Sequence, residues 1–249
     1  MTDTDRIQKH YQQIANIYDD LWFFSEGFIQ FFAKKIIQSL DLKPKHRLVD
    51  LGGGTGIYSK GILEQIKLES PILCVDPSAE MLAKIPPNNG IDALCLDAVT
   101  FSGQPGSYDR ILMKEAIHLI PEKQQLFHQL FARLSSGGRF LLLLLPPKID
   151  YPLFKKAIAV YETTQPDYQD LVKLMQQSGF EIKVSFEEYP LKFPKEKYFQ
   201  MVKNRYMTLL SRFDDRELEA GLAEMAETYQ NQSMLEFGDR MVFLTATKA

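Results

Sequence analysis

The sequence predicts an α/β fold in which a parallel sheet carries helices on both faces. Between residues 48 and 145, five short apolar runs of strand type alternate with stretches that have helical periodicity. This alternation requires crossover connections, which make the strands parallel and place the helices on the two faces of the sheet. Ligands of such sheets bind at the carboxyl ends of the strands, so functional residues are expected there.

The expected elements follow one another along the chain without internal repeats. Two helical patterns occupy residues 5 to 40 and are separated near Ser25 and Gly27. Strands are then expected at Leu48–Leu51, Ile72–Val75, Ala93–Leu96, Ile111–Met113 and Phe140–Leu145, with helices at Tyr58–Lys67, Ala79–Ile85 and Gln124–Leu134. Beyond Pro147 the pattern predicts helices at Phe154–Tyr161 and Tyr168–Ser178, a strand at Gly179–Val184, about forty helical residues from Pro190 to Gln230, and a strand at Arg240–Thr245.

One of these strands ends in an acid and continues into a glycine-rich turn. Asp50 is followed by glycines that alternate at positions 52, 54 and 56. Glycines remove the Cβ atoms that keep a backbone away from a ligand, and the helix that follows offers unpaired N–H groups. A dinucleotide turn has its third glycine three positions after the second, where this chain has Ile57. The turn therefore predicts a site for a small polar molecule, but not for a dinucleotide.

The stretch from Asp50 to Gly56 resembles the first motif of class I S-adenosylmethionine-dependent methyltransferases, an acid followed by alternating glycines. The resemblance runs from about Tyr11 to the C-terminus, and the segment Tyr11–Asp19 is similar to the N-terminal helix that covers the cofactor in many small-molecule methyltransferases. It implies a Rossmann-like, doubly wound sheet of seven mostly parallel strands with an antiparallel last strand and a helical cap. It also implies S-adenosyl-L-methionine as cofactor.

The same resemblance implies one methyltransferase domain over residues 1–249. Its parts are an N-terminal helical lid at 1–42, a cofactor-binding core at 43–147 and a substrate-side half at 148–249, with a helical insertion at about 190–235. In this family an insertion between the last two strands often shapes the substrate pocket, so the acceptor is expected there and beneath the lid.

Two acids beyond the glycine turn are expected to bind the adenosine part of the cofactor. Asp76 ends the second strand, where a carboxylate can accept both ribose hydroxyls. The alternative is a helix N-cap at Asp76 or Ser78. By the resemblance, Asp97 accepts from the adenine amino group and the Ala98 N–H serves a ring nitrogen, whereas the alternative for Asp97 is a surface turn.

Other residues complete the predicted cofactor site. By the resemblance Met81 lies against the adenine, although a methionine packed in the core is the alternative. Asp50 is expected to order the turn rather than to react. The full predicted cofactor-binding set is Tyr18, Asp50, Gly52, Gly53, Gly54, Asp76, Pro77, Met81, Asp97, Ala98 and Lys114.

The end of the fourth strand carries the candidate catalytic group. His118 is the best candidate for a general base, because an imidazole of ordinary pKa near 6.5 suits proton removal at neutral pH. The alternative is a histidine that packs against a helix with its ring satisfied by backbone. Tyr18 is the second candidate catalytic residue. Lys114 departs from the small or polar residue common at this place in the family, and it could pair with Glu115 or Asp50, or meet an acidic substrate.

The substrate site is predicted from aromatic and basic residues. Aromatic faces tolerate a positive sulfonium, so Tyr11 and Trp22, together with Tyr18 and Phe23, are expected to wall the pocket. Arg205 and Arg212 are seven residues apart, so on a continuous helix they would share a face and could bind a carboxylate or a phosphate. Solvated helix charges are the alternative. Asp214 or Asp215 is expected to cap the helix that follows.

Composition narrows the class of protein. With 29 basic and 32 acidic residues the net charge is −3, and the lack of a basic tract disfavours a nucleic-acid partner. The longest apolar run, Phe140–Leu145, is too short to span a bilayer, and the first thirty residues lack a secretory signal. Cys74 and Cys95 are expected to be buried thiols, and the four histidines lack metal-ligand spacing. A cytoplasmic monomer or homodimer without a metal or a membrane partner is expected.

Together these features predict an S-adenosylmethionine-dependent methyltransferase. It would transfer a methyl group to an O, N or C atom of a small-molecule metabolite or natural product by in-line displacement. One alternative is a nicotinamide-dependent oxidoreductase, against which Ile57 argues. Another is a non-catalytic protein that keeps the cofactor on the same fold.

Overall fold

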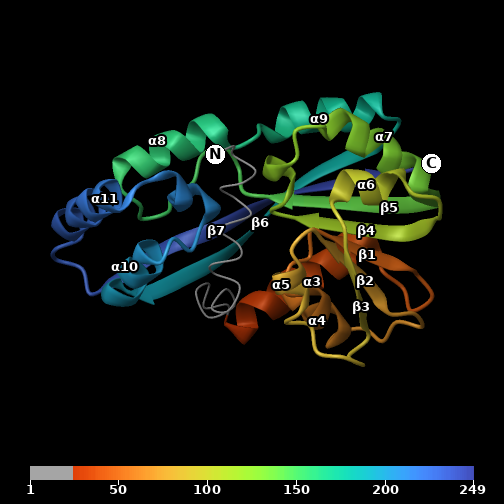
Figure 1. The fold of residues 1–249 in the computed structure, drawn as a ribbon, viewed down its shortest axis with the longest axis horizontal. Coiled ribbons are helices and arrows are strands. Elements are labelled where there is room, and N and C mark those ends of the chain that lie inside the picture. The colour runs from red at the N-terminus through yellow and green to blue at the C-terminus, as the bar shows by residue number, and fades with distance from the viewer. Residues whose placement is uncertain (1–24) are drawn as a thin grey trace. The chain divides into compact units, whose positions relative to one another are not determined.

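The structure is a computed structural model, and it describes residues 25–249. Its strands form one seven-stranded sheet in the order β3-β2-β1-β4-β5-β7-β6 (Figure 1). The pairs among β1 to β5 are parallel, and β7 is antiparallel to β5. The predicted fold is confirmed. Tyr11, Tyr18, Trp22 and most of the predicted lid lie outside the described residues.

The element bounds, with the labels of Figure 1, are as follows. The strands are β1 Leu48–Leu51, β2 Ile72–Asp76, β3 Ile91–Cys95, β4 Tyr108–Lys114, β5 Leu134–Leu144, β6 Glu181–Pro194 and β7 Met234–Thr247. The helices are α3 Glu26–Leu40, α4 Ile57–Leu63, α5 Ala79–Leu82, α6 Ala98–Gly103, α7 Lys123–Arg133, α8 Lys155–Thr164, α9 Tyr168–Gln177, α10 Lys195–Lys203 and α11 Asp215–Thr228, and the 3₁₀ turns are η1 Ile117–Leu119 and η2 Thr208–Arg212.

The central strands are apolar throughout because both of their faces are covered. All four residues of β1 are buried, and the leucines at the end of β5 are buried as well. Helices α3, α4 and α5 lie on one side of the sheet and α6, α7 and α9 on the other (Figure 1). A parallel strand buried on both faces reads as a continuous hydrophobic run, as these segments do. The sheet therefore holds the ends of β1, β2 and β4 rigidly beside one another.

The chain divides into two compact units. The first contains Leu145–Gln165 and Glu188–Arg240 among the described residues, and the second contains residues 25–144, Pro166–Glu187 and Met241–Ala249. The long strands β6 and β7 contribute residues to both units. The predicted division into lid, core and substrate-side half stays a prediction.

The first unit is built around aromatic rings and one buried acid. The Tyr151 hydroxyl donates to the Asp239 carboxylate at 2.5 Å, and the hydroxyls of Tyr198 and Tyr206 are 2.9 Å apart. All four residues are buried. Because each of these polar atoms has a partner, the unit can bury them at little cost.

The C-terminal third differs from the sequence prediction in two places. Strand β6 extends to Pro194, so residues 190–194 are strand and not helix, and β7 begins at Met234, six residues before the predicted Arg240. Side chains in β6 alternate in exposure, which suits a strand at a sheet edge better than a helix.

In the first half of the chain, the short helix α6 was not predicted, because its six residues are too few to show helical periodicity.

The predicted continuous helix carrying Arg205 and Arg212 is wrong. Helix α10 ends at Lys203, and Arg205 has a left-handed φ of 54°, which no α-helix accommodates. Arg212 ends the separate 3₁₀ turn η2. The two arginines therefore share no helix face.

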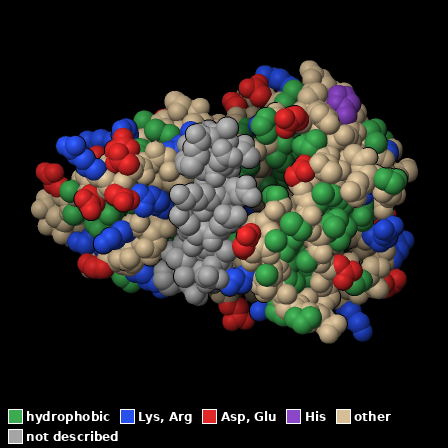
Figure 2. Space-filling view, in the orientation of Figure 1, with side chains coloured by type: hydrophobic (Ala, Val, Ile, Leu, Met, Phe, Trp, Pro, Cys, Tyr) green, Lys and Arg blue, Asp and Glu red, His purple; other side chains and the backbone are tan. Residues whose placement is uncertain are grey.

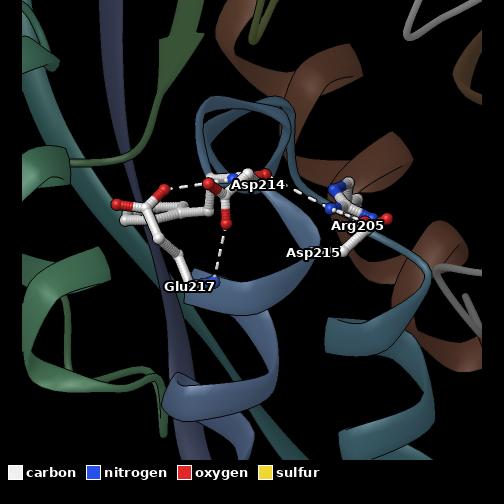
Figure 3. Close-up of polar contacts among 5 residues, drawn as sticks. Arg205, Asp214, Asp215 and Glu217 are labelled. Carbon is white, nitrogen blue, oxygen red and sulfur yellow. Dashed lines mark hydrogen bonds and ion pairs between the residues drawn. The ribbon is translucent and has the colours of Figure 1, made fainter.

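The predicted cap of the next helix is confirmed at Asp214. Its side chain accepts from the Glu217 N–H at 2.8 Å, and the Glu217 carboxylate accepts from the Asp214 N–H at 3.1 Å (Figure 3). This reciprocal capping box satisfies two N–H groups at the start of α11. It fixes where the chain turns from η2 into the helix.

Candidate functional site

The glycine turn after β1 is the centre of the candidate site. Gly52, Gly54 and Gly56 have φ of 79°, 57° and 73°, values that side chains with a Cβ rarely adopt. A Cβ on Gly52 would lie 2.7 Å from the Cβ of Ala116. Positions 52 and 54 thus need glycine for backbone conformation, and position 52 also for space. The turn leaves its backbone close to the surrounding strand ends.

Asp50 is a buried carboxylate directly beneath this turn. It is 3% exposed, and the Ser59 hydroxyl donates to it at 2.6 Å. Burial, with a smaller contribution from nearby Asp76, raises the pKa of Asp50 to about 6, against the Ser59 hydrogen bond and the charge of Lys114. Its contact with Ser59 of α4 ties the strand to the following helix, which agrees with the predicted role in ordering the turn.

Asp76 at the end of β2 is joined to the glycine turn. One of its carboxylate oxygens accepts from the Gly54 N–H at 2.9 Å and the other from the Ser78 N–H at 2.9 Å. Burial raises the pKa of Asp76, and these two backbone bonds oppose the rise. Each carboxylate oxygen can accept more than one hydrogen bond, so both can also receive ribose hydroxyls.

The residue that caps the helix after β2 is Ser78 and not Asp76. The Ser78 hydroxyl accepts from the Met81 N–H at 3.2 Å and caps α5. Met81 is 3% exposed, and its Cε would lie 3.4 Å from a Cβ placed on Gly54. The methionine therefore lies against the turn as well as in the core.

Asp97 caps helix α6 at the end of β3. Its side chain accepts from the Thr100 N–H at 2.9 Å. Partial burial opposes ionisation, but the hydrogen bonds from Thr100 outweigh it and lower the pKa of Asp97. The Leu96 N–H donates to the Asp76 backbone oxygen at 3.1 Å, which brings the ends of β2 and β3 together. Asp97 is exposed and ionised, so the cap leaves room for a ligand on its carboxylate.

The end of β4 brings Lys114 to the same place. The Lys114 ammonium lies 4.6 Å from the centroid of the Tyr58 ring, a cation–π contact, and its charge acts on Asp50. Glu115 follows with a left-handed φ of 52°, and its N–H donates to the Leu143 backbone oxygen at 2.9 Å. His118 is half-buried in the 3₁₀ turn η1. This strand end thus brings one cation close enough to act on Asp50.

Arg205, in the first unit, is held by its own neighbours. Its guanidinium donates to the Asp215 carboxylate at 2.7 Å and to the Phe213 backbone oxygen at 3.2 Å (Figure 3). Asp215 is 90% exposed, so this pair contributes little to stability. Both contacts are made by one terminal nitrogen of the guanidinium, Nη2.

The structure adds residues that sequence reasoning did not assign to the site. Ser59 and Tyr58 lie in the first turn of α4, and Cys74 of β2 packs so close to Gly53 that a Cβ there would lie 2.5 Å from the sulfur. Burial raises the pKa of the Cys74 thiol, which makes it an inert packing group. Position within the turn after Gly56 was the only sequence signal for Tyr58 and Ser59. Cys95, predicted to be buried, is exposed.

Three further observations bear on the class of site. Within residues 25–249 no group of three or more His, Cys, Asp or Glu side chains is placed to hold a metal ion. No helix in that part of the chain has the length and apolar character to cross a membrane. On the face drawn in Figure 2, acidic and basic side chains are interspersed over α10 and α11. The absence of a nucleic-acid partner stays a prediction.

Comparison with known proteins identifies the domain. The sequence model of the family described as "Methyltransferase domain" matches residues 49–140, which run from β1 into β5 and include the glycine turn, Asp76, Asp97 and Lys114. The chain carries a methyltransferase domain. The resemblance drawn from Asp50 to Gly56 is thereby confirmed, and the match supports an enzyme of the S-adenosylmethionine-dependent class.

One curated relative aligns with part of the chain. Phosphoethanolamine N-methyltransferase 2 of Caenorhabditis elegans is 24% identical over 115 residues, which make up 43% of this chain and 26% of that protein. The aligned part of the chain spans about a quarter of the length of this relative.

Solved structures share the fold of the methyltransferase domain at low identity. A protein of Anabaena variabilis, described as a methyltransferase from an antibiotic biosynthesis pathway, is 16% identical with a TM-score of 0.65 over 86% of this chain and 96% of its own. Phosphoethanolamine N-methyltransferase 2 of Haemonchus contortus, in complex with phosphomonomethylethanolamine and S-adenosylhomocysteine, is 17% identical with a TM-score of 0.65 over 100% of this chain and 60% of its own. At these identities the likeness shows the fold.

Proposed function

We propose that the protein uses S-adenosyl-L-methionine to methylate an O, N or C atom of a small molecule. The observation that carries this proposal is the contact between the glycine turn and Asp76: the Gly54 N–H donates to the Asp76 carboxylate at 2.9 Å, beside Met81. This arrangement combines a close-approach backbone, an acceptor for two hydroxyls and an apolar wall. These three features fit the adenosine part of the methyl donor.

The cofactor would be held by residues at the ends of three strands. Asp76 would accept the ribose hydroxyls, and Met81 and Pro77 would lie along the adenosine. Asp97 would accept from the adenine amino group, with the Ala98 N–H donating to the ring. The alternating glycines 52 and 54, together with Gly53, would let the backbone approach the ligand. This assignment is supported by the distances that connect the turn with Asp76 and the end of β2 with β3.

Lys114 would pair with the carboxylate of the donor's methionine part. A lysine is a compact point charge, and Lys114 lies over the Tyr58 ring with its charge acting on Asp50. Asp50 would keep the turn in shape from below. Tyr18, expected at the same site, lies outside the described residues.

In methyl transfer the main task of the protein is to position the acceptor relative to the methyl group of the cofactor. When bound, the cofactor supplies an electrophilic methyl group on a positively charged sulfur. The chain's part is to hold the acceptor in line, to exclude water and to tolerate the positive charge. His118, half-buried in η1 after β4, would remove a proton from an acceptor that needs it. An amine that is already neutral would not require this step.

The acceptor is proposed to be a small metabolite or natural product. Tyr11 and Trp22 remain candidates for its site and lie outside the described residues. Arg212 remains a candidate for an anionic group on the acceptor, whereas Arg205 would first have to leave Asp215. Two of the three similar proteins named above are phosphoethanolamine N-methyltransferases, so a phosphorylated amine belongs in any acceptor panel.

Calorimetric titration with S-adenosylhomocysteine tests the donor. We expect micromolar binding to the wild-type protein and at least a tenfold loss of affinity in Asp76→Ala, because the carboxylate that receives two hydroxyls is gone. Asp92→Ala, at an exposed position of the neighbouring strand β3, should bind as the wild type does. No binding at high micromolar ligand, or equal binding by the Asp76 variant, would refute the proposal.

Two further assays separate the alternatives. Titration with NADH should show no saturable binding, whereas saturation there and not with the methyl donor would favour an oxidoreductase. Labelled S-adenosylmethionine is then incubated with amine, alcohol and carbon acceptors, the phosphorylated amine included. Methylation by the wild type and not by Asp76→Ala supports the enzyme, and retention of cofactor without transfer to any acceptor supports the non-catalytic binding protein.

A further inference from the structure

Strand β6 is the last strand of the sheet, and its outer edge has no partner strand among residues 25–249. In the strand order it is hydrogen-bonded to β7 alone. An edge strand presents backbone N–H and C=O groups that can pair with another strand. At fourteen residues β6 is long for such an edge, where short strands are the rule. The edge is therefore a candidate for pairing with another chain.

Prolines restrict pairing to the first part of β6. Pro190 and Pro194 have no N–H to donate, so they interrupt any ladder along the second part. Residues 181–189 have no proline, and residues 181–187 of this stretch lie in the second unit. The pairing-competent segment is thus 181–189.

The same segment exposes apolar surface. Val184 and Phe186 are 38% and 40% exposed, the largest exposure of any large hydrophobic side chain recorded for the described residues. They lie two residues apart and so on one face of the strand, where Phe186 meets the ring of Tyr168 at 5.6 Å. Placing them opposite apolar partners would remove this surface from water.

The sequence of the segment is complementary to itself. If two copies pair antiparallel about Ser185, Val184 of each faces Phe186 of the other, and Lys183 of each faces Glu187 of the other. Moving the axis to position 184 places Glu181 opposite Glu187, and moving it to 186 places Val184 opposite Glu188. The register about Ser185 alone among these three joins both apolar and both charged pairs.

Glu187 can make the new contact without losing its present one. One of its oxygens lies 2.9 Å from the Lys35 ammonium of α3, and its side chain is 27% exposed. A carboxylate has a second oxygen, so it can accept from Lys183 of the other copy at the same time. Lys183 is exposed on the strand.

We propose that two copies of this chain form a twofold-symmetric dimer by antiparallel pairing of β6 about Ser185. The apolar pairs give attraction, and the lysine–glutamate pairs select the register. The proposal is independent of methyl transfer, since it concerns only the sheet edge. Closed twofold pairing also removes the edge from further association.

Sedimentation velocity of the full chain over a range of micromolar concentrations tests the dimer. We expect the wild type to sediment as a dimer, and Lys183→Glu to raise the dissociation constant at least tenfold because glutamates would then face each other. The triple variant Lys35→Glu/Lys183→Glu/Glu187→Lys restores opposite charges between the copies and keeps an opposite charge at position 35 beside position 187, so it should recover association. Lys67→Glu makes the same charge change at an exposed position after α4 and should leave association unchanged.

A wild type that stays monomeric up to several hundred micromolar overturns the proposal, as does a dimer that Lys183→Glu leaves intact. Failure of the triple variant to recover association overturns the register.

Cross-linking gives a second, direct test of the register. In a Cys95→Ser background, Ser185→Cys places two thiols opposite each other at the axis, while Cys74 is buried. Mild oxidation should convert Ser185→Cys into a covalent dimer. Lys183→Cys, whose copies would be four positions apart along the pair, should remain largely uncross-linked. Equal cross-linking of the two variants, or none in Ser185→Cys, contradicts pairing about Ser185.

Discussion

Replacing Asp50 by asparagine is expected to make the protein more stable above neutral pH. Burial raises the pKa of Asp50 from 3.8 to about 6, so the folded protein binds this proton more tightly than the unfolded chain does. The stability that the proton confers is complete below about pH 4 and is lost as the pH rises through about 6. The difference between 3.8 and about 6 corresponds to about 3 kcal/mol at pH 7 and above.

Asparagine keeps an acceptor for the Ser59 hydroxyl but has no charge to bury. The unfolding free energy of Asp50→Asn minus that of the wild type should therefore increase by about 2 kcal/mol between about pH 4 and pH 7. Groups that titrate in this range without interacting with Asp50 act equally on both proteins and cancel in the difference. The sign is the informative part, because losing an ordinary stabilising carboxylate would give the opposite trend.

Urea unfolding followed by circular dichroism at several pH values measures this difference. Asp92→Asn, an exposed acid on β3, serves as the control and should track the wild type within about 0.5 kcal/mol. The reasoning is refuted if the stability curves of Asp50→Asn and the wild type run parallel from pH 4 to pH 8, or if the variant becomes relatively less stable as the pH rises.

Three further substitutions test the packing of the first unit, each by urea unfolding of the apo protein. Gly221→Ala on α11 should destabilise by about 1–3 kcal/mol, because its Cβ would lie 2.5 Å from the Phe154 ring. Tyr151→Phe should cost about 1–3 kcal/mol, because it removes the hydroxyl that donates to the buried Asp239 carboxylate. Asp214→Ala should cost about 0.5–2 kcal/mol through loss of the capping box.

Matched variants distinguish these causes from general damage. Phe154→Leu should recover part of the stability in the Gly221→Ala background. Tyr161→Phe, which removes a hydroxyl that donates to a neutral backbone oxygen, should cost less than Tyr151→Phe. Asp215→Ala, beside the cap but 90% exposed, should stay within about 0.5 kcal/mol. Equal losses within any of these pairs would contradict the mechanism given for it.

Strand and helix identity in the first half of the chain could be predicted because local pattern and burial agree there. The run Leu48–Leu51 is buried on both faces, so the sequence shows it as a continuous apolar segment that ends where the strand ends. The glycines at 52, 54 and 56 have left-handed backbone conformations, which their identity had suggested. Here each residue's own chemistry dictates its conformation.

Beyond residue 180 the local sequence pattern gave wrong element boundaries, because contacts with segments far away in the sequence decide the secondary structure there. Residues 190–194 belong to β6, the edge strand, which pairs with β7. Its pairing partner β7 lies about forty residues further along the chain, so the local sequence does not show the pairing. Arg205 interrupts the continuous helix that would have carried both Arg205 and Arg212, and no glycine or proline marks the break. Asp214 was still recognisable as a cap, since capping depends on residues only three apart.

The sequence by itself determined the fold class, the position of the glycine turn and the acids at the strand ends, because apolar periodicity and glycine placement are local properties. The tertiary structure alone decided that Ser59 donates to Asp50, that Lys114 lies over the Tyr58 ring and acts on Asp50, and that burial raises the pKa of that acid to about 6. These properties depend on distances between segments brought together by the sheet. Burial and charge proximity are absent from a linear sequence, and they appear only when the strands are side by side.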